Sequence, residues 1–386
     1  MRVGFVIDFN KSRWLGGFEY LKNLFYSLRL INSNINPIII VDDNYNIKDL
    51  KELGVKEIYK SKYLRRYGFF RYFHKISIIL FGKNFILDKF FEKININIIS
   101  HSFFTGNNSS VQSIVWFPDF QEVNKYNFIS LKKIFFRKLN IYLSSIHSTK
   151  IILSSNKAKN DLKRINYKSF KKSTVVQPSF LTIKSKNLFP LSYLKNKFKI
   201  EKHFFFLPNH YWIHKNHIII LKALSLFKKN KPLIISTGYF NDDRYPEHKK
   251  SIIDFINSNN LQKYYKILGV VSFKEMISMM YHSMSVINPS KSEGWSSTVE
   301  QAKSLKKNVV LSKIAVHKEQ KPSRSYFFHP NDHYELSRIL ARIEKNFIYK
   351  KEIKIIKNYE AENVEACRMF AYKYEKLVNS ILKMAK

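Results

Sequence analysis

Short apolar runs alternate with amphipathic stretches along the whole chain. The runs are rich in Ile, Val and Phe, as expected of strands buried on both faces of a parallel sheet. Strands are expected at residues 3–7, 37–41, 55–59, 94–99, 113–116 and 150–153, and again at 204–207, 232–236, 265–268, 286–287, 309–311 and 325–328. Stretches of helical periodicity separate them, the first at residues 17–30. This alternation predicts an α/β protein with doubly wound, Rossmann-like sheets.

The alternating pattern is interrupted once. Between residues 175 and 202, polar residues and the prolines Pro178 and Pro190 replace it. A chain of 386 residues is long enough for two domains with separate cores. We therefore expect one Rossmann-like domain at residues 1–180, a second at 195–360, and a helical C-terminal segment at 361–386.

Composition narrows the class of protein. The apolar fraction of 45% and the aromatic fraction of 16% exclude global disorder. The single cysteine, Cys367, permits no internal disulfide and offers no metal cluster, which fits a reducing cytoplasm. The sequence has no run of about 18 apolar residues, so it predicts no membrane-spanning helix. Asp8 comes too early for the apolar core of a signal peptide.

The formal net charge of +38 favours anionic partners, such as acidic lipid, a phosphorylated acceptor or nucleic acid. Lys, Asn, Ile and Phe are all plentiful, as in proteins of AT-rich genomes, and this accounts for much of the excess. The basic residues are spread along the chain, which argues against a nucleic-acid-binding arm. Residues 63–93 mix basic and aromatic side chains, which suits docking on an anionic membrane and equally suits a packed helix with solvated lysines.

The segment 288–320 gives the strongest indication of a ligand site. It follows an apolar strand, passes through Glu293-Gly294, and reaches Ser296 and Ser297 at the start of a helical pattern. Unpaired N–H groups at a helix start favour an anion, and a carboxylate beside them can hold hydroxyl groups. The pattern predicts a site for a phosphate next to a sugar.

This segment resembles the donor-binding motif of retaining GT-B glycosyltransferases, most nearly glycosyltransferase family 4 (group 1) of the bacterial surface-polysaccharide type. The motif is Glu-Gly-aromatic, with a second Glu eight residues after the first, and Glu293-Gly294-Trp295 fits its first half. Gln301 occupies the position of the second Glu, while Glu300 stands one residue earlier, about 100° around a helix. The resemblance implies that Glu293 holds the donor sugar and that Gln301 or Glu300 holds the ribose.

A second resemblance lies in residues 209–217, after the first strand of the second domain. In the family, an Arg and, five residues later, a Lys hold the donor diphosphate, and His210 and Lys215 occupy these positions. Lys215 supplies a compact charge, whereas a neutral His210 would supply none. The histidines here also allow a metal site, but no carboxylate or thiolate stands at a supporting spacing. We expect no metal, and a nucleotide-sugar as co-substrate with no other cofactor.

Two glycine-containing segments complete the expected donor site. Gly16 and Gly17 match the Gly-Gly pair that opens the family's first helix, where backbone approaches the donor phosphates closely. Gly269 and Val270 match the loop beneath the nucleotide base. Many strand–helix turns contain glycine, so glycine alone is weak evidence for a phosphate site. The prediction for Gly16 and Gly17 depends on their position, which matches the family's first loop.

Residues 116–121 resemble the Pro-Asp-Phe-Gln segment of bacterial surface-polysaccharide glycosyltransferases. In those enzymes a His that contacts the donor sugar comes next, whereas this chain has Glu122. Glu122 is therefore a candidate catalytic residue, together with Lys215 and Glu293. The alternative is that this segment is a structural loop whose aromatic residues only pack against the wall of the cleft. The acidic pairs at 42–43 and 242–243 are expected to be loop or cap residues, because GT-B enzymes use Lys and helix N-termini in place of a metal-binding Asp pair.

The resemblance implies two Rossmann-like domains facing across a cleft, with a C-terminal helix crossing back to the first. It implies a cytoplasmic enzyme, peripheral to the inner membrane face, that transfers a hexose-type sugar with retention to a glycan or lipid-linked acceptor in surface polysaccharide or lipopolysaccharide synthesis. Charge neutralisation by Lys215 and by the N–H groups of residues 295–297 and Gly17 would assist the leaving diphosphate.

Two other functions remain open from the sequence. A degenerate, non-catalytic relative that binds a sugar nucleotide or glycan would explain His210, Glu122 and Gln301, which all depart from the family pattern. A nucleic-acid-binding protein is favoured by the positive charge alone, since the chain carries no RNA-recognition, helix-turn-helix or zinc-finger motif. We expect no nucleic-acid partner.

Overall fold

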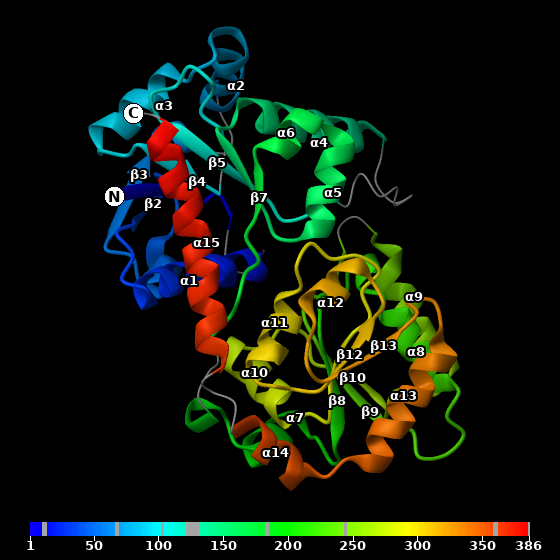
Figure 1. Cartoon of the computed structure of the whole chain (residues 1–386). Helices are drawn as coiled ribbons and strands as arrows, with labels where there is room; N and C mark the ends of the chain where they lie inside the picture. Colours follow the sequence, from blue (N-terminus) through cyan, green and yellow to red (C-terminus); the bar gives the residue numbers. More distant parts are fainter. Residues whose placement is uncertain are drawn as a thin grey trace. The chain divides into compact units, whose positions relative to one another are not determined.

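The computed structural model describes residues 1–9, 14–65, 69–101, 104–120, 131–181, 185–242, 245–357 and 362–384. The chain forms two compact units (Figure 1). Unit 1 contains Met1–Ser179 together with Glu365–Lys386, and unit 2 contains Phe180–Val364. The chain therefore begins and ends in the same unit.

Unit 1 is built on a seven-stranded sheet in the order β3-β2-β1-β4-β5-β6-β7, in which every paired strand is parallel to its neighbour. Its strands are β1 (Arg2–Val6), β2 (Asn36–Asp42), β3 (Glu57–Ser61), β4 (Ile98–Ser100), β5 (Gln112–Phe117), β6 (Lys150–Leu153) and β7 (Ser173–Val175). Its helices are α1 (Leu15–Leu30), α2 (Phe69–Phe81), α3 (Phe85–Lys93), α4 (Leu131–His147), α5 (Asn156–Ile165), α6 (Tyr167–Lys171) and α15 (Glu362–Met384), with short 3-10 turns η1 (Ile47–Leu53) and η2 (Lys62–Leu64).

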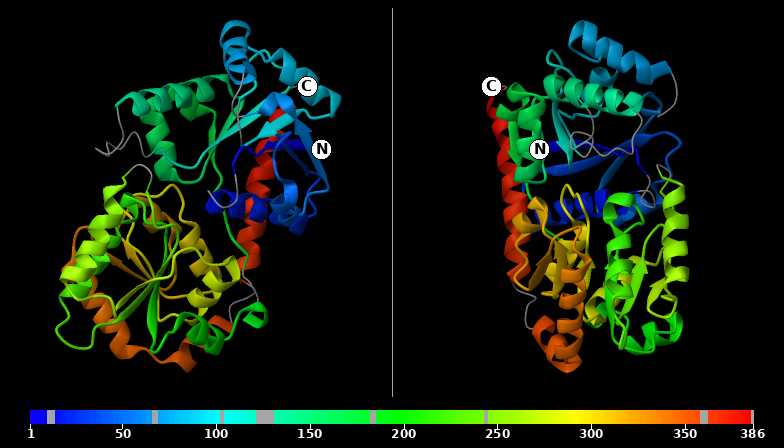
Figure 2. Two further views of the ribbon diagram at one scale, coloured as in Figure 1. Left: turned by 180° about the vertical axis from the view of Figure 1, so that it is seen from behind. Right: turned by 90° about the vertical axis from the view of Figure 1, so that its right-hand side faces the viewer.

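Alternating side chains of the strands fill two cores on opposite faces of this sheet. In β2, Ile39 and Val41 join a cluster with α1 and α15, whereas Ile38 and Ile40 join a cluster with α3. Strand side chains point alternately to the two faces, so a sheet covered on both faces needs continuous apolar strands. The C-terminal helix α15 lies along unit 1 in each view (Figure 2) and buries Phe370 and Tyr374 in its core. The predicted return of the C-terminal helix to the first domain is confirmed.

Unit 2 has a six-stranded sheet in the order β10-β9-β8-β11-β12-β13, again with parallel pairing. Its strands are β8 (Phe204–Pro208), β9 (Leu233–Thr237), β10 (Tyr265–Ile267), β11 (Val286–Asn288), β12 (Val309–Ser312) and β13 (Ser325–Phe328). Its helices are α7 (Leu191–Phe198), α8 (His217–Ser225), α9 (Glu247–Ser258), α10 (Phe273–His282), α11 (Ser297–Ser304), α12 (Ala315–Gln320), α13 (His333–Asn346) and α14 (Tyr349–Lys357), with 3-10 turns η4 (Ser185–Asn187) and η5 (Ile213–Lys215).

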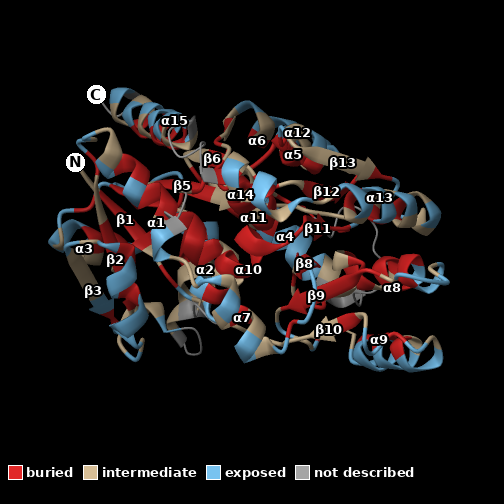
Figure 3. Cartoon of the chain, turned by 90° about the horizontal axis from the view of Figure 1, so that it is seen from below, coloured by how far each residue is buried: buried red, intermediate tan, exposed pale blue. Residues whose placement is uncertain are grey.

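The core of unit 2 is divided by its sheet in the same way. Phe205 and Leu207 of β8 pack with α8, α9 and α13, while Phe204 and Phe206 pack with α7, α10 and α11 on the other face. The central strands are buried, and the exposed residues lie on the outer sides of helices such as α9 and α13 (Figure 3). The prediction of two doubly wound parallel sheets is confirmed.

Three local features differ from the sequence-based expectation. The strand predicted at 94–99 begins only at Ile98, because Ile94 caps α3 and Asn95 has a positive φ of 55°. The strand β7 was not predicted, since its sequence Ser-Thr-Val is short and polar. The helix α7, which spans the predicted domain start at residue 195, belongs to unit 2 and buries Leu194 in its core.

No helix within the described residues is both long enough and apolar enough to span a bilayer.

Candidate functional site

A cluster of hydrogen-bonded polar side chains in unit 2 lies where the strand order of its sheet reverses. From β8 the chain continues to β9 and β10 on one side, and it returns on the other side as β11, which pairs directly with β8. The loops that leave the carboxyl ends of β8 and β11 therefore diverge. Such a switch point is where open parallel sheets bind ligands.

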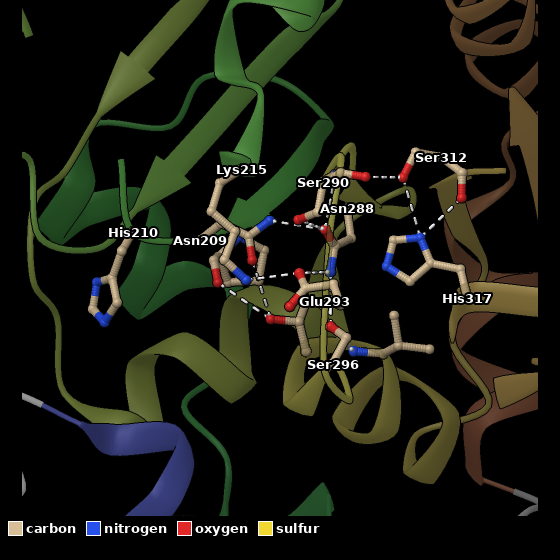
Figure 4. Close-up of polar contacts among 12 residues, drawn as sticks. Asn209, His210, Lys215, Asn288, Ser290, Glu293, Ser296, Ser312 and His317 are labelled. Carbon is tan, nitrogen blue, oxygen red and sulfur yellow. Dashed lines mark hydrogen bonds and ion pairs between the residues drawn. The ribbon is translucent and has the colours of Figure 1, made fainter. Parts of the chain in front are cut away.

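An ion pair joins these two loops. The Lys215 Nζ, at the end of η5, lies 2.7 Å from Oε1 of Glu293 in the loop after β11 (Figure 4). The two side chains are only 13% and 8% exposed. Water and salt screen the attraction in such a buried pair less than they screen a surface pair.

The environment keeps Glu293 ionised. Burial by itself would raise the pKa of this carboxyl, but the neighbouring Lys215 ammonium outweighs it and lowers the pKa to about 2. The Nδ2 of Asn288 adds a long hydrogen bond of 3.4 Å to the same Oε1 atom. Glu293 is therefore a fixed negative charge and hydrogen-bond acceptor throughout the neutral pH range.

Asn288, the last residue of β11, organises the loop that carries Glu293. Its Nδ2 donates to Ser296 Oγ at 2.7 Å, and its Oδ1 accepts from Ser290 Oγ at 2.6 Å. From the neighbouring β8 loop, Asn209 Nδ2 donates to the same Oδ1 atom at 3.4 Å. One buried amide thus connects the loops after β8 and β11 with the start of α11.

Asn216 fixes the position of Lys215. It has a left-handed conformation with φ 58°, which asparagine tolerates better than most residues. Its Nδ2 donates to the carbonyl oxygens of Pro289 and Pro330, at 3.1 and 2.9 Å. Because Asn216 directly follows Lys215, these bonds hold the lysine against the β11 loop.

The start of α11 presents backbone donors beside Glu293. Ser296 is the N-cap, and its side chain accepts the N–H of Val299 at 3.3 Å. The N–H groups of Ser297 and Thr298 have no acceptor among the residues that the structure describes. Free N–H groups at a helix start attract anions. Gly294 and Trp295 form the turn between Glu293 and this N-cap.

Glu300 and Gln301 differ in their surroundings. Glu300 is buried, which raises its pKa, and it accepts hydrogen bonds from Lys303 Nζ at 3.0 Å and from Gln320 Nε2 at 2.9 Å. The same Gln320 amide also donates to the Ser296 carbonyl at 2.9 Å, so Glu300 helps to join α12 to the start of α11. The side-chain amide of Gln301 makes no hydrogen bond within the described part of the chain.

His210 is held in one tautomer. Its Nδ1 accepts the backbone N–H of Tyr239 at 2.9 Å, so the proton of the neutral ring is on Nε2. Burial, assisted by the charge of Lys215, lowers its pKa to about 4. The ring lies to one side of the Lys215–Glu293 pair (Figure 4). His210 is therefore a neutral donor at pH 7 and not a second cation.

Residues 193–362 match the family model described as glycosyl transferases group 1. This region of unit 2 is therefore similar to the group 1 glycosyl transferases. It contains Lys215, Glu293 and both of the loops that they join.

Solved structures extend the likeness to the whole chain. A glycosyltransferase from Rickettsia africae ESF-5 is 17% identical, with a TM-score of 0.69 over 99% of this chain and 98% of that one. Anabaena Alr3699/HepE in complex with UDP and glucose is 13% identical, with a TM-score of 0.69 over 98% and 100%. Sucrose-phosphate synthase from Thermosynechococcus elongatus is 12% identical, with a TM-score of 0.70 over the full length of both chains. At these identities the comparisons establish the GT-B fold. No curated protein sequence matches the chain.

The predicted base-binding loop of unit 2 follows β10. Gly269 has a φ of 70°, and its carbonyl accepts the N–H of Gly238 at 2.8 Å. Val270 is 71% exposed. Gly238, with a φ of 128°, allows close approach of two loops, since a Cβ there would lie 2.7 Å from the Asn209 carbonyl oxygen.

In unit 1, Gly16 and Gly17 lie inside the first turn of α1 and not before it. A Cβ on Gly17 would lie 2.5 Å from the indole ring of Trp14, so this glycine lets Trp14 pack on the helix. Trp14 stacks on Trp116 at 5.5 Å between ring centroids. Glu122, the remaining predicted catalytic residue, lies outside the described residues.

Among the described residues, no group of three or more His, Cys, Asp or Glu side chains is arranged to hold a metal ion. The histidines of the 209–217 segment have separate partners. His217 Nδ1 bonds the Tyr265 hydroxyl at 2.8 Å, and the His214 carbonyl accepts the N–H of Lys291 at 2.8 Å. Asp242 accepts the N–H of Ile213 at 3.1 Å and thereby stabilises the loop before Lys215.

Sequence reasoning missed Asn288, Asn216 and His317. Asn288 is a polar residue at the carboxyl end of an apolar strand, which is a usable indication of a site. His317 is fully buried, and its Nδ1 donates to the Ser312 carbonyl at 2.9 Å. Its Nε2 has no hydrogen-bond partner in the described structure. No sequence pattern indicates that α12 brings this ring next to the Glu293 loop.

Proposed function

We propose that the chain transfers a sugar from a nucleoside-diphosphate sugar to a hydroxyl group of a glycan or glycolipid acceptor. The observation that carries this proposal is the buried Lys215–Glu293 pair at the switch point of the sheet in unit 2. A cation for a diphosphate and an anion for sugar hydroxyls meet there, beside the free N–H groups of α11. A nucleotide-sugar presents these same chemical groups side by side.

The pair suggests how donor binding is coupled to catalysis. The β-phosphate competes with Glu293 for the Lys215 ammonium, and the released carboxylate then accepts hydrogen bonds from the sugar. As the glycosidic bond breaks, negative charge grows on the diphosphate, and Lys215 and the N–H groups of Ser297 and Thr298 stabilise it. In this proposal the diphosphate charge is balanced by protein groups without a metal ion.

The remaining assignments depend on the family resemblance. They are retention of the anomeric configuration, transfer of a hexose-type sugar, and a role in surface polysaccharide or lipopolysaccharide synthesis in the cytoplasm. Gln301, whose amide has no partner within the described residues, is the better of the two candidates for the ribose, because Glu300 is occupied by Lys303 and Gln320. Glu122 is kept as a candidate contact to the donor sugar.

Thermal unfolding in the presence of UDP, GDP, CMP, dTDP and ADP tests the donor site. A ligand at about 100 times its dissociation constant should raise the free energy of unfolding by about 2.7 kcal/mol. We expect one diphosphate to do so, and the matching sugar nucleotide to be consumed when a glycan acceptor is supplied. If none of these nucleotides raises the midpoint of thermal unfolding, the proposed donor site is contradicted.

A non-catalytic binder is the second candidate, favoured by the neutral state of His210. Such a protein would be stabilised by a nucleoside diphosphate and yet consume no sugar nucleotide with any acceptor. The two measurements together therefore distinguish a transferase from a binding protein.

Replacing His210 by alanine should weaken nucleoside-diphosphate binding by about three- to tenfold, the effect of one neutral hydrogen bond. In the wild-type protein this contribution should not change between pH 5.5 and 8, because the pKa of His210 is about 4. Calorimetric titration across this range measures both effects. The exposed His329, replaced by alanine, is the control. Binding by the wild-type protein that strengthens below pH 7, with the change lost in His210→Ala, would show a charged ring instead.

A further inference from the structure

Large apolar side chains face solvent along α2 in unit 1. Tyr72, Ile76, Ile79 and Leu80 are spaced as one face of a helix, and the two ends of this face, Tyr72 and Leu80, are 71% and 67% exposed. Ile78, on the opposite side of the helix, is buried against the sheet. The helix thus has a packed apolar side and an unpacked apolar side.

The helix α4 has the same property. Phe135, Leu139 and Tyr142 follow helical spacing and are exposed, with Phe135 at 63%. Ile141 and Leu143, on its inner side, pack into the core clusters of unit 1. Ten of the 21 large hydrophobic side chains exposed in the described structure lie between Tyr72 and Tyr142. Exposed apolar residues scattered singly need no explanation, but such a concentration indicates an interaction surface.

The two helices are neighbours. Lys75 Nζ of α2 donates to Asn140 Oδ1 of α4 at 3.2 Å. Ile78 of α2 and Leu143 of α4 pack in one cluster with Val115 of β5. All views show the helices beside each other at one end of unit 1 (Figures 1 and 2). We call the exposed side chains of residues 72–81 and 135–142 the α2–α4 face.

The α2–α4 face is basic as well as apolar. Neither α2 nor α4 contains an Asp or Glu, and Lys75, Arg137 and Lys138 stand among the apolar residues. Lys83, in the turn after α2, lies over the ring of Phe85, 4.6 Å from its centroid. Aromatic and aliphatic side chains mixed with Lys and Arg are typical of helices that lie in the interface of an anionic bilayer.

We propose that the α2–α4 face binds the surface of an anionic lipid bilayer. The apolar side chains enter the headgroup region, and the lysines and arginine contact acidic lipid headgroups. Charge complementarity selects this occupant over a second copy of the chain. A symmetric dimer through this face would bring two acid-free, basic surfaces together, at a cost in repulsion. The proposal stands without the proposed glycosyl transfer, since lipid binding needs no donor.

Cosedimentation with vesicles of phosphatidylglycerol and phosphatidylcholine tests the face, with phosphatidylcholine alone as the reference. Because a chain of net charge +38 attracts any anionic surface, the decisive variant leaves the charge unchanged. Ile79→Gln/Leu80→Gln should lower the partition coefficient about tenfold, and binding by the wild-type protein should persist in part at high salt. The matched control is Ile253→Gln/Ile348→Gln, which replaces two exposed apolar residues of unit 2.

A second measurement locates the contact directly. An environment-sensitive dye on Leu80→Cys should shift to the blue on anionic vesicles, while the same dye on Ile348→Cys should not, and the native Cys367 is buried. Equal vesicle binding by all variants, with no dye shift, would mean attraction by net charge alone and would overturn the proposal. Concentration-dependent dimerisation without lipid, lost in Ile79→Gln/Leu80→Gln, would assign the face to a second copy. Retention of RNA in place of vesicles, reduced by the same variant, would overturn it as well.

Discussion

Lys215→Ala should lower kcat/KM for sugar transfer by about 100- to 1000-fold, the usual effect of removing one group that stabilises transition-state charge. It should also abolish the thermal stabilisation by the nucleoside diphosphate that the wild-type protein binds. The reason is that Lys215 is the cation that the β8 loop brings to the switch point, while the neighbouring His210 is neutral. Steady-state kinetics and thermal unfolding measure the two effects.

The same variant should also be less stable. Removing Lys215 leaves Glu293 buried without its cation, which costs about 3–5 kcal/mol in similar cases. The double variant Lys215→Ala/Glu293→Gln removes both charges and should recover much of this stability without recovering activity. Lys318→Ala, an exposed lysine of α12, is the control for loss of a positive charge. Near-normal transfer by the double variant would show that the pair is structural only.

Glu293→Gln should have opposite effects on binding and on transfer. We expect nucleoside-diphosphate affinity to rise about three- to tenfold, because the phosphate no longer competes with a carboxylate for Lys215. Transfer should fall about 100-fold, because a fixed acceptor for the sugar hydroxyls is lost. Calorimetric titration and kinetics on one preparation give both numbers. A parallel loss of affinity and transfer would contradict the competition between donor and carboxylate.

The pH dependence of stability provides an independent test of the Glu293 environment. Its pKa is lowered to about 2 in the folded protein, below the ordinary value of 4.5. The unfolded chain therefore takes up the proton first, so the stabilisation is complete above about pH 4.5 and is lost as the pH falls towards 2. The full contribution of this pKa shift to the free energy of unfolding is on the order of 3 kcal/mol. The difference in the free energy of unfolding between wild-type and Glu293→Gln should shrink between pH 6 and pH 3.

The sheets could be predicted because their strands are buried on both faces. Such strands must be apolar throughout, and the predicted limits of β6 are those of the structure. The edge strand β7 carries little of the core, so its polar sequence gave no indication. The strand β4 is shorter than its apolar pattern predicts, because the chain bends at Asn95 and the strand begins only at Ile98.

The site could be predicted only in part. Lys215 and Glu293 belong to local motifs, but their contact joins residues 78 positions apart and depends on the pairing of β8 with β11. Asn288, Asn216 and His317 act through loops that only the fold brings together. A sequence motif identifies the groups that meet a ligand more readily than the groups that hold them in place.

Because α15 belongs to unit 1 but follows unit 2 in the sequence, the two units are not completed in the order in which their synthesis starts. Unit 2 is one continuous segment, and all its residues are synthesised before the C-terminal segment of unit 1. Unit 1, although its synthesis starts before that of unit 2, lacks Phe370 and Tyr374 of its core until α15 leaves the ribosome. Unit 1 is thus begun before unit 2 and completed after it, and its apolar surface against α15 stays exposed to water, or to a chaperone, until then.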